Sequence, residues 1–105
     1  MEGYAMIINT TVVDNNVTLA LVGRLDTVTS SDLSTELSKV FEGEVKTLIF
    51  DFNRLDYISS SGLRLLLVSQ KKVNATHAQM SIIGCSDSLR EIFEMTGFLD
   101  IMTIE

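Results

Sequence analysis

The chain contains no proline and no tryptophan, one cysteine and one histidine. A single cysteine, Cys85, excludes an internal disulfide and fits a reducing compartment. A single histidine, His77, excludes a histidine pair for a metal ion, and its place in a loop between a predicted helix and a predicted strand favours a surface residue over a catalytic one. Walker A and Gly-x-Gly-x-x-Gly patterns are also absent. We therefore predict no metal, no cofactor and no catalytic residue, so that the protein is not an enzyme.

Basic residues are scarce. Eight Lys and Arg stand against fourteen Asp and Glu, which gives a formal net charge of −6. Such a surface repels a phosphate backbone and an anionic membrane, so we predict no nucleic-acid partner. The longest dense apolar run, Leu65–Val68, is too short to cross a bilayer, and the first ten residues lack the basic region of a signal peptide. These patterns predict a cytoplasmic protein without membrane insertion and indicate no particular oligomeric state.

The chain of 105 residues is 46% apolar and 21% charged. These values are typical of one folded domain, which we expect to span residues 1–105. Alternating or continuous apolar residues predict four strands, and a fifth is expected at Ile101–Ile104. The four strands are Met6–Val13, Val17–Val22, Val45–Phe52 and Ala78–Gly84. A hairpin at Asp14–Asn16 is expected to join the first two.

Three helices are predicted from apolar spacing and caps. The first begins at a capping-box-like Thr29-Ser30-Ser31-Asp32 and ends before Gly43; the second runs from Ser60 or Ser61 to about Val73; the third runs from Ser86 to Gly97. The order β-β-α-β-α-β-α predicts an α/β fold with a mixed, mostly parallel sheet. The first strand is expected to be antiparallel to the second, and the helices are expected to favour one face.

In such a sheet, the carboxyl ends of parallel strands and the starts of the following helices share one edge, where binding sites concentrate. Three segments fit this position: Gly23–Asp26, Asp51–Gly62 and Gly84–Ser86. The middle segment contains three consecutive serines at a helix start, although one hydroxyl is enough for a cap. A cap with small neighbours explains them, and so does a phosphorylation site at the positive end of a helix. A hydrolase would need a general base near Ser61, for which only Asp26, Asp51 and Asp56 are candidates.

Two longer segments resemble a known family. VGRLDTVTSSDL is similar to a Gly-x-Leu-Asp turn followed by a capped helix, and TLIFDFNRLDYISSSGLRLLL is similar to the signature of the STAS domain (sulphate transporter and anti-sigma factor antagonist). The resemblance continues to EMTGF and covers essentially the whole chain. It is greatest to the stand-alone bacterial anti-sigma factor antagonists.

This resemblance implies a partner-switching regulator of transcription. The serine before the glycine, here Ser61, would be phosphorylated by an anti-sigma factor that is also a serine kinase. Phosphorylation would end the binding of that anti-sigma factor, and a PP2C-type phosphatase would restore it. The expected partner-binding residues are Asp26, Ser59, Ser60, Gly62 and Leu63.

The chain departs from the family at one position. The family commonly has Asp-Ser-Ser-Gly, whereas this chain has Ser59-Ser60-Ser61-Gly62. The departure leaves an alternative, an accessory STAS subunit of a lipid transporter or a sensory complex that is not phosphorylated.

Overall fold

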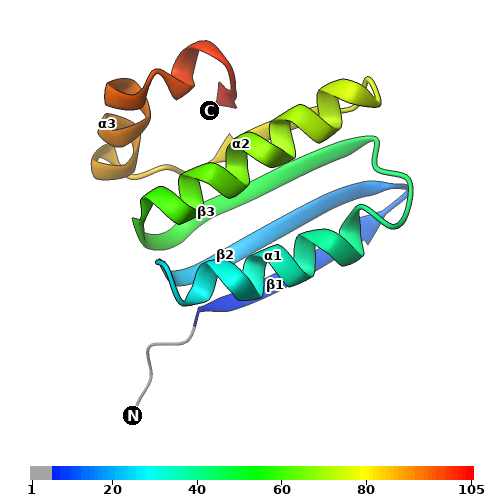
Figure 1. Ribbon diagram of the computed structural model, residues 1–105, viewed down its shortest axis with the longest axis horizontal. Coiled ribbons are helices and arrows are strands. Elements are labelled where there is room, and N and C mark those ends of the chain that lie inside the picture. Colours follow the sequence, from blue (N-terminus) through cyan, green and yellow to red (C-terminus); the bar gives the residue numbers. More distant parts are fainter. Residues whose placement is uncertain (1–5) are drawn as a thin grey trace.

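The computed structural model describes residues 6–105, which form a sheet with helices packed on it (Figure 1). The predicted domain also includes residues 1–5, which lie outside the described part. The elements in chain order are β1 (Ile7–Val13), β2 (Asn16–Leu25), α1 (Thr29–Val40), β3 (Thr47–Ile58), α2 (Ser60–Ala75), β4 (Gln79–Ile83), α3 (Asp87–Thr96), a short 3-10 helix (Phe98–Asp100) and β5 (Thr103–Ile104). Among residues 6–105, no helix has the length and apolarity needed to cross a membrane.

The five strands follow one another across the sheet in the order β1-β2-β3-β4-β5. β1 is antiparallel to β2, and the remaining neighbours are parallel. The predicted α/β class, the antiparallel first pair and the short last strand are confirmed. β1 and β2 are joined by Asp14 and Asn15, which have φ angles of 52° and 67°. Two such residues are typical of a two-residue hairpin turn.

The core lies between one face of the sheet and the helices. The side chains of Leu19, Leu48 and Phe50 point to that face and are fully buried, as expected from the alternation of side chains along a strand. α1 and α2 lie side by side over the sheet in Figure 1. Phe93 of α3 stacks on Phe52 of β3 at 6.5 Å between ring centroids, so α3 packs on the same face. The helices therefore favour one face, as predicted.

The third strand is longer than the sequence indicated. We expected it to end at Phe52, but β3 continues to Ile58 and pairs with β2 as far as Leu25. The pairing shifts twice, between Ala20 and Val22 and between Gly23 and Arg24. Each shift is an irregularity of the bulge type, which places an extra β3 residue against β2. The buried positions therefore cease to alternate after Phe52, and this loss of period concealed the second half of the strand.

Candidate functional site

The turn between β2 and α1 is built around Asp26. Its Oδ1 accepts hydrogen bonds from the backbone N–H of Val28 at 3.0 Å and of Thr29 at 2.9 Å. In return, the N–H of Asp26 donates to Thr29 Oγ1 at 2.8 Å. This reciprocal pair has the hydrogen-bond pattern of a capping box, starting three residues before the first residue of α1, while Val28, which directly precedes α1, makes no side-chain cap. The predicted box at Thr29–Asp32 was therefore wrong by three residues, because Asp26 is the acceptor and Thr29 closes the box.

These hydrogen bonds also favour the charged form of the Asp26 carboxyl. The backbone N–H of Thr29 is the main cause that lowers the pKa of the Asp26 carboxyl below its ordinary value of 3.8, against an opposing effect of desolvation. A carboxylate with a lowered pKa is a weak proton acceptor. Three aspartates were considered as the general base of a hydrolase. Asp26 is engaged by the hydrogen bonds of its turn. Asp51 accepts a hydrogen bond from the side chain of Asn53 at 2.7 Å, and Asp56 is exposed on β3.

The second half of the site is the start of α2. Ser59 is the N-cap: it has an extended backbone, and its Oγ accepts from the N–H of Gly62 at 3.3 Å. The prediction that Ser60 or Ser61 opens the helix is confirmed, since α2 begins at Ser60. Serine and aspartate are equally good caps. Ser59 therefore supplies here the cap that an aspartate could also supply, without the charge of a carboxylate.

The cap leads to a prediction about stability. We expect Ser59→Ala to lower the free energy of unfolding by about 1 kcal/mol, because the N–H of Gly62 loses its acceptor. Ser59→Asp should change it by less than about 0.5 kcal/mol in either direction, because the cap is kept. Urea denaturation followed by circular dichroism measures both. Equal loss in the two variants would contradict the role of Ser59 as the N-cap.

The two halves meet at Leu25. The carbonyl of Leu25 accepts from the N–H of Ser59 at 2.8 Å. The side chain of Leu25 is fully buried and lies directly under Gly62. A Cβ at Gly62 would lie 2.7 Å from Leu25 Cγ and 2.9 Å from Ile58 Cγ1. Only glycine fits this contact, and it brings the first turn of α2 against the residue that precedes Asp26.

The remaining predicted residues lie on this first turn. Ser60 is exposed, Ser61 and Leu63 are half-buried, and Gly62 is buried. Among residues 6–105, no group is hydrogen-bonded to Ser61 Oγ, whereas the hydroxyls of Thr29, Ser30 and Ser59 are all engaged. The first turn of a helix also leaves backbone N–H groups without helical partners. Ser61 thus has a free hydroxyl at the positive end of α2.

Two further side chains belong to this end of the sheet, and the sequence analysis did not identify them. Val28, in the turn before α1, is 77% exposed. Tyr57, near the end of β3, is exposed and carries the guanidinium of Arg24 at 4.2 Å from its ring centroid. Arg24 and Tyr57 are paired across β2 and β3, but this pairing could not be predicted while residues 53–58 were assigned to a loop. We call Asp26, Val28, Tyr57 and residues 59–63 the switch surface.

The third predicted segment, Gly84–Ser86, follows β4 and meets β3 near the middle of that strand. β4 ends at Ile83, which pairs with Asp51, in the middle of β3. Gly84 follows with a φ of 75° and packs against Asn53, whose Cγ would lie 2.4 Å from a Cβ at that position. Gly84 therefore contacts Asn53, which belongs to the predicted segment Asp51–Gly62. The contact is with the start of that segment and not with its serine end, because β3 extends well beyond β4.

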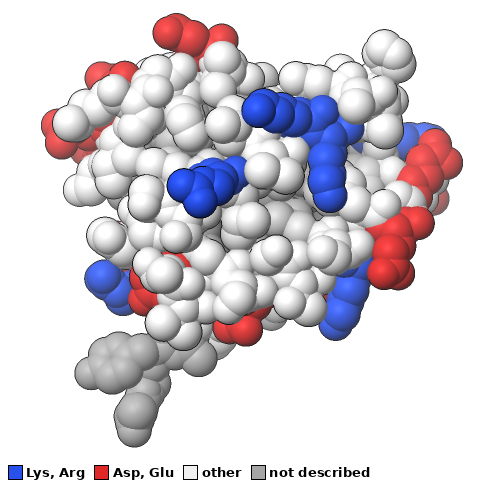
Figure 2. All heavy atoms as spheres, viewed as in Figure 1, with Lys and Arg blue, Asp and Glu red and all other residues white. Residues whose placement is uncertain are grey.

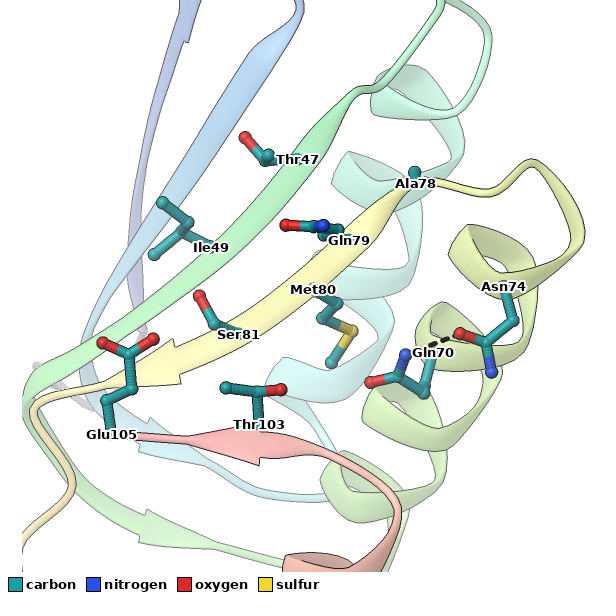
Figure 3. A pocket seen from close by; sticks show the side chains of 10 residues that line it. All are labelled: Thr47, Ile49, Gln70, Asn74, Ala78, Gln79, Met80, Ser81, Thr103 and Glu105. Carbon is teal, nitrogen blue, oxygen red and sulfur yellow. Dashed lines mark hydrogen bonds between the residues drawn. The ribbon is translucent and has the colours of Figure 1, made fainter.

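Two hollows of the described surface lie away from Ser61. One of about 580 Å³ lies at the edge of β4, between the second half of α2 and β5 (Figure 3). In it, Gln70 donates to Asn74 at 2.9 Å while its Oε1 is buried without a partner. A second, of about 360 Å³, lies at the opposite end of the sheet near Phe41 and His77. Among residues 6–105, no cluster of His, Cys, Asp or Glu is suited to a metal ion.

Charge is unevenly distributed over the helices. α2 contains three basic residues, Arg64, Lys71 and Lys72, and no acidic residue. Figure 2 shows basic side chains gathered over this helix, with acidic side chains towards the rim of the view. The chain as a whole is acidic. The switch surface therefore adjoins a positive helix face on a negative molecule.

Known proteins resemble this chain over most of its length. The putative anti-sigma factor antagonist BtrV of Bordetella bronchiseptica is 29% identical over 92 residues, which are 88% of this chain and 79% of BtrV. The anti-sigma-B factor antagonist of Staphylococcus aureus is 28% identical over 97 residues, 92% of this chain and 90% of that protein. Both names describe regulators and not enzymes.

Solved structures of anti-sigma factor antagonists also resemble this chain. The anti-sigma factor antagonist SpoIIAA in its unphosphorylated form has a TM-score of 0.82 and 26% identity, with 94% of this chain and 88% of SpoIIAA covered. The structure of Bacillus SpoIIAA in its phosphorylated form has a TM-score of 0.74 and 26% identity, with 96% of this chain and 91% of SpoIIAA covered. The STAS domain profile matches residues 8–105. This chain belongs to the STAS domain family.

Proposed function

We propose that this protein is an anti-sigma factor antagonist. It binds an anti-sigma factor that is also a serine kinase, and phosphorylation of Ser61 ends that binding. The observation that carries the proposal is the free hydroxyl of Ser61 on the first turn of α2, held against the Asp26 turn through Leu25 and Gly62. The names of the similar proteins, one of which has been solved in a phosphorylated form, support it.

The local chemistry suits a phosphoserine. Ser61 Oγ attacks the γ-phosphorus of ATP, the bond to the bridging oxygen breaks, ADP leaves and the hydroxyl proton passes to the kinase. The phosphate then lies at a helix N-terminus, where N–H groups and the helix dipole favour an anion. Arg64 is three residues further along α2 and on the same side of the helix. It can pair with the phosphate without a change of fold.

Partner binding is proposed for the switch surface. Val28 and Tyr57 supply exposed apolar and aromatic area, which interface cores use. Asp26 and the basic face of α2 supply charges of both signs. A partner with a mixed charged face fits this arrangement. A phosphate in the middle of it adds negative charge where the interface must exclude water, which opposes binding. A PP2C-type phosphatase would restore the surface by removing that charge.

We expect the anti-sigma factor kinase of the same genome to transfer one phosphoryl group from ATP to Ser61. Intact-mass and peptide mass spectrometry measure the product. Ser61→Ala should abolish it, while Ser60→Ala should leave the site of modification unchanged, because the neighbouring hydroxyl is not the acceptor. Labelling that persists in Ser61→Ala would contradict the assignment. Tight binding of the kinase without labelling would favour an accessory STAS subunit that is not phosphorylated.

A further inference from the structure

Among residues 6–105, β1 forms an edge of the sheet that pairs with no strand on its outer side. Its seven residues, IINTTVV, have a single neighbouring strand and contain no charged residue and no proline. Ile7, Val12 and Val13 are 55%, 60% and 59% exposed. Natural edge strands are usually protected by charge, proline, a bulge or short length. The opposite edge, β5, has two residues, but β1 is long and pairs with β2 without any shift of register.

The hairpin turn determines which backbone groups of β1 point outward. In a two-residue turn, the carbonyl of Val13 accepts from the N–H of Asn16, so these two residues form a hydrogen-bonded pair. Bonded and non-bonded pairs alternate along an antiparallel ladder. Ile8, Thr10 and Val12 therefore occupy non-bonded positions opposite β2. Their N–H and C=O groups point away from β2, toward the open edge.

These three residues lie at the centre of a self-complementary strand. When a second β1 is placed antiparallel about Thr10, Ile8 faces Val12 of the other copy and Thr10 faces Thr10. On the opposite side of the sheet, Ile7 faces Val13. Apolar residues thus meet apolar residues at both ends of the strand and polar residues meet polar residues at its centre. The outward backbone groups of each copy match those of the other. We propose that β1 is a homodimer interface in which two copies pair antiparallel about Thr10.

The symmetric arrangement explains why a second copy fits better than an unrelated strand. A two-fold interface requires one patch to complement itself, and the pattern of apolar and polar residues in IINTTVV reads the same in both directions. A single edge-to-edge strand contact is smaller than a standard stable interface. The dimer is therefore weak and reversible. No residue of the switch surface belongs to β1, so the paired molecules keep that surface free.

Charge opposes the association. Each copy carries a net charge of −6. Thr10 Oγ1 donates to Glu36 Oε2 at 2.6 Å, which places the Glu36 carboxylate beside the two-fold axis. Two such carboxylates repel each other across that axis, and salt screens the repulsion. Association should therefore become stronger as ionic strength rises, and Glu36→Gln should strengthen it at low salt.

Sedimentation equilibrium of the full chain, from about 10 μM to about 1 mM, tests the proposal over the range in which weak complexes form. We expect the mass to rise from 11.6 kDa toward twice that value, and to rise further with added NaCl. Val12→Lys should weaken association at least tenfold, because a charge enters the pairing. Met95→Lys, the same change of charge at an 80% exposed residue of α3, should associate like the parent.

Thr10→Pro provides a second test, because it removes one outward N–H that β2 does not use. It should also weaken association at least tenfold. Circular dichroism establishes that each variant is folded. A constant mass of 11.6 kDa at every concentration and salt would overturn the proposal. So would association that Val12→Lys and Thr10→Pro leave unchanged, because the interface would then lie elsewhere.

Discussion

Ser61→Asp should bind the anti-sigma factor at least about 100-fold more weakly than the parent protein, a difference of about 2.7 kcal/mol. The variant places a carboxylate on the first turn of α2, where the proposed interface excludes water. Truncating or mismatching a buried charge at an interface costs about 2–5 kcal/mol, because the charge loses water without gaining a partner. Isothermal titration calorimetry with the purified anti-sigma factor measures the affinity directly.

Two variants separate charge from size and position. Ser61→Asn introduces a side chain of the same size without charge, and its affinity should stay within about fivefold of the parent, since one neutral polar contact contributes about 1 kcal/mol. Ser88→Asp is the positional control. Ser88 is the second residue of α3, as Ser61 is of α2; it is exposed and also follows a serine N-cap. Its affinity should match that of the parent.

The outcomes of these three variants distinguish the mechanisms. Equal losses in Ser61→Asp and Ser61→Asn would contradict a switch based on charge and indicate a steric one. A loss in Ser88→Asp as large as in Ser61→Asp would contradict the location of the switch surface. Unchanged affinity in all three would mean that α2 does not contact the partner at its first turn.

The order of elements could be predicted because each one has a local signal. The Asp14–Asn16 turn, the Ser86 cap and the left-handed Gly97 at the end of α3 all lie where the sequence indicated. The end of β3 was predicted wrongly because its second half has no such local signal. Residues after Phe52 are held in the sheet by pairing with β2 across two shifts of register, a contact between distant segments that leaves no period in the local sequence.

The same distinction applies to the site. The serine run was visible as a helix start, and Ser59 is its cap. The hydrogen bonds that Asp26 accepts from the N–H groups at the start of α1 were not recognised, because Thr29-Ser30-Ser31 also consists of residues that are favoured as caps. Val28 and Tyr57 carry no motif, and only the fold reveals that both are exposed at the end of the sheet where β2 and β3 finish. The sequence therefore predicted which side chains could act at the site, but not which residues of different strands lie close together.

The contact between Leu25 and Gly62 should produce the largest effects on stability. Leu25→Ala removes a fully buried side chain and should cost about 2–5 kcal/mol of the free energy of unfolding. Gly62→Ala has two opposing effects. Alanine is favoured over glycine in a helix by about 1 kcal/mol, but its Cβ would meet Leu25 Cγ at 2.7 Å and Ile58 Cγ1 at 2.9 Å. Overpacking typically costs about 1–3 kcal/mol, so we expect a net loss.

The double variant Leu25→Ala/Gly62→Ala tests whether the contact itself is responsible. With the Leu25 side chain gone, the new methyl group enters the cavity instead of a packed core, so the helix preference for alanine is recovered. The double variant should be more stable than the sum of the two losses by at least about 1 kcal/mol, well above the roughly 0.5 kcal/mol scatter of independent sites. Leu89→Ala/Gly62→Ala, in which the deleted leucine is equally buried but belongs to α3, should be additive. Urea unfolding of the full cycle measures both couplings. Additivity in the Leu25 cycle would mean that α2 approaches Asp26 by some other contact, and the Ser61 switch would lose its structural link to the β2–α1 turn.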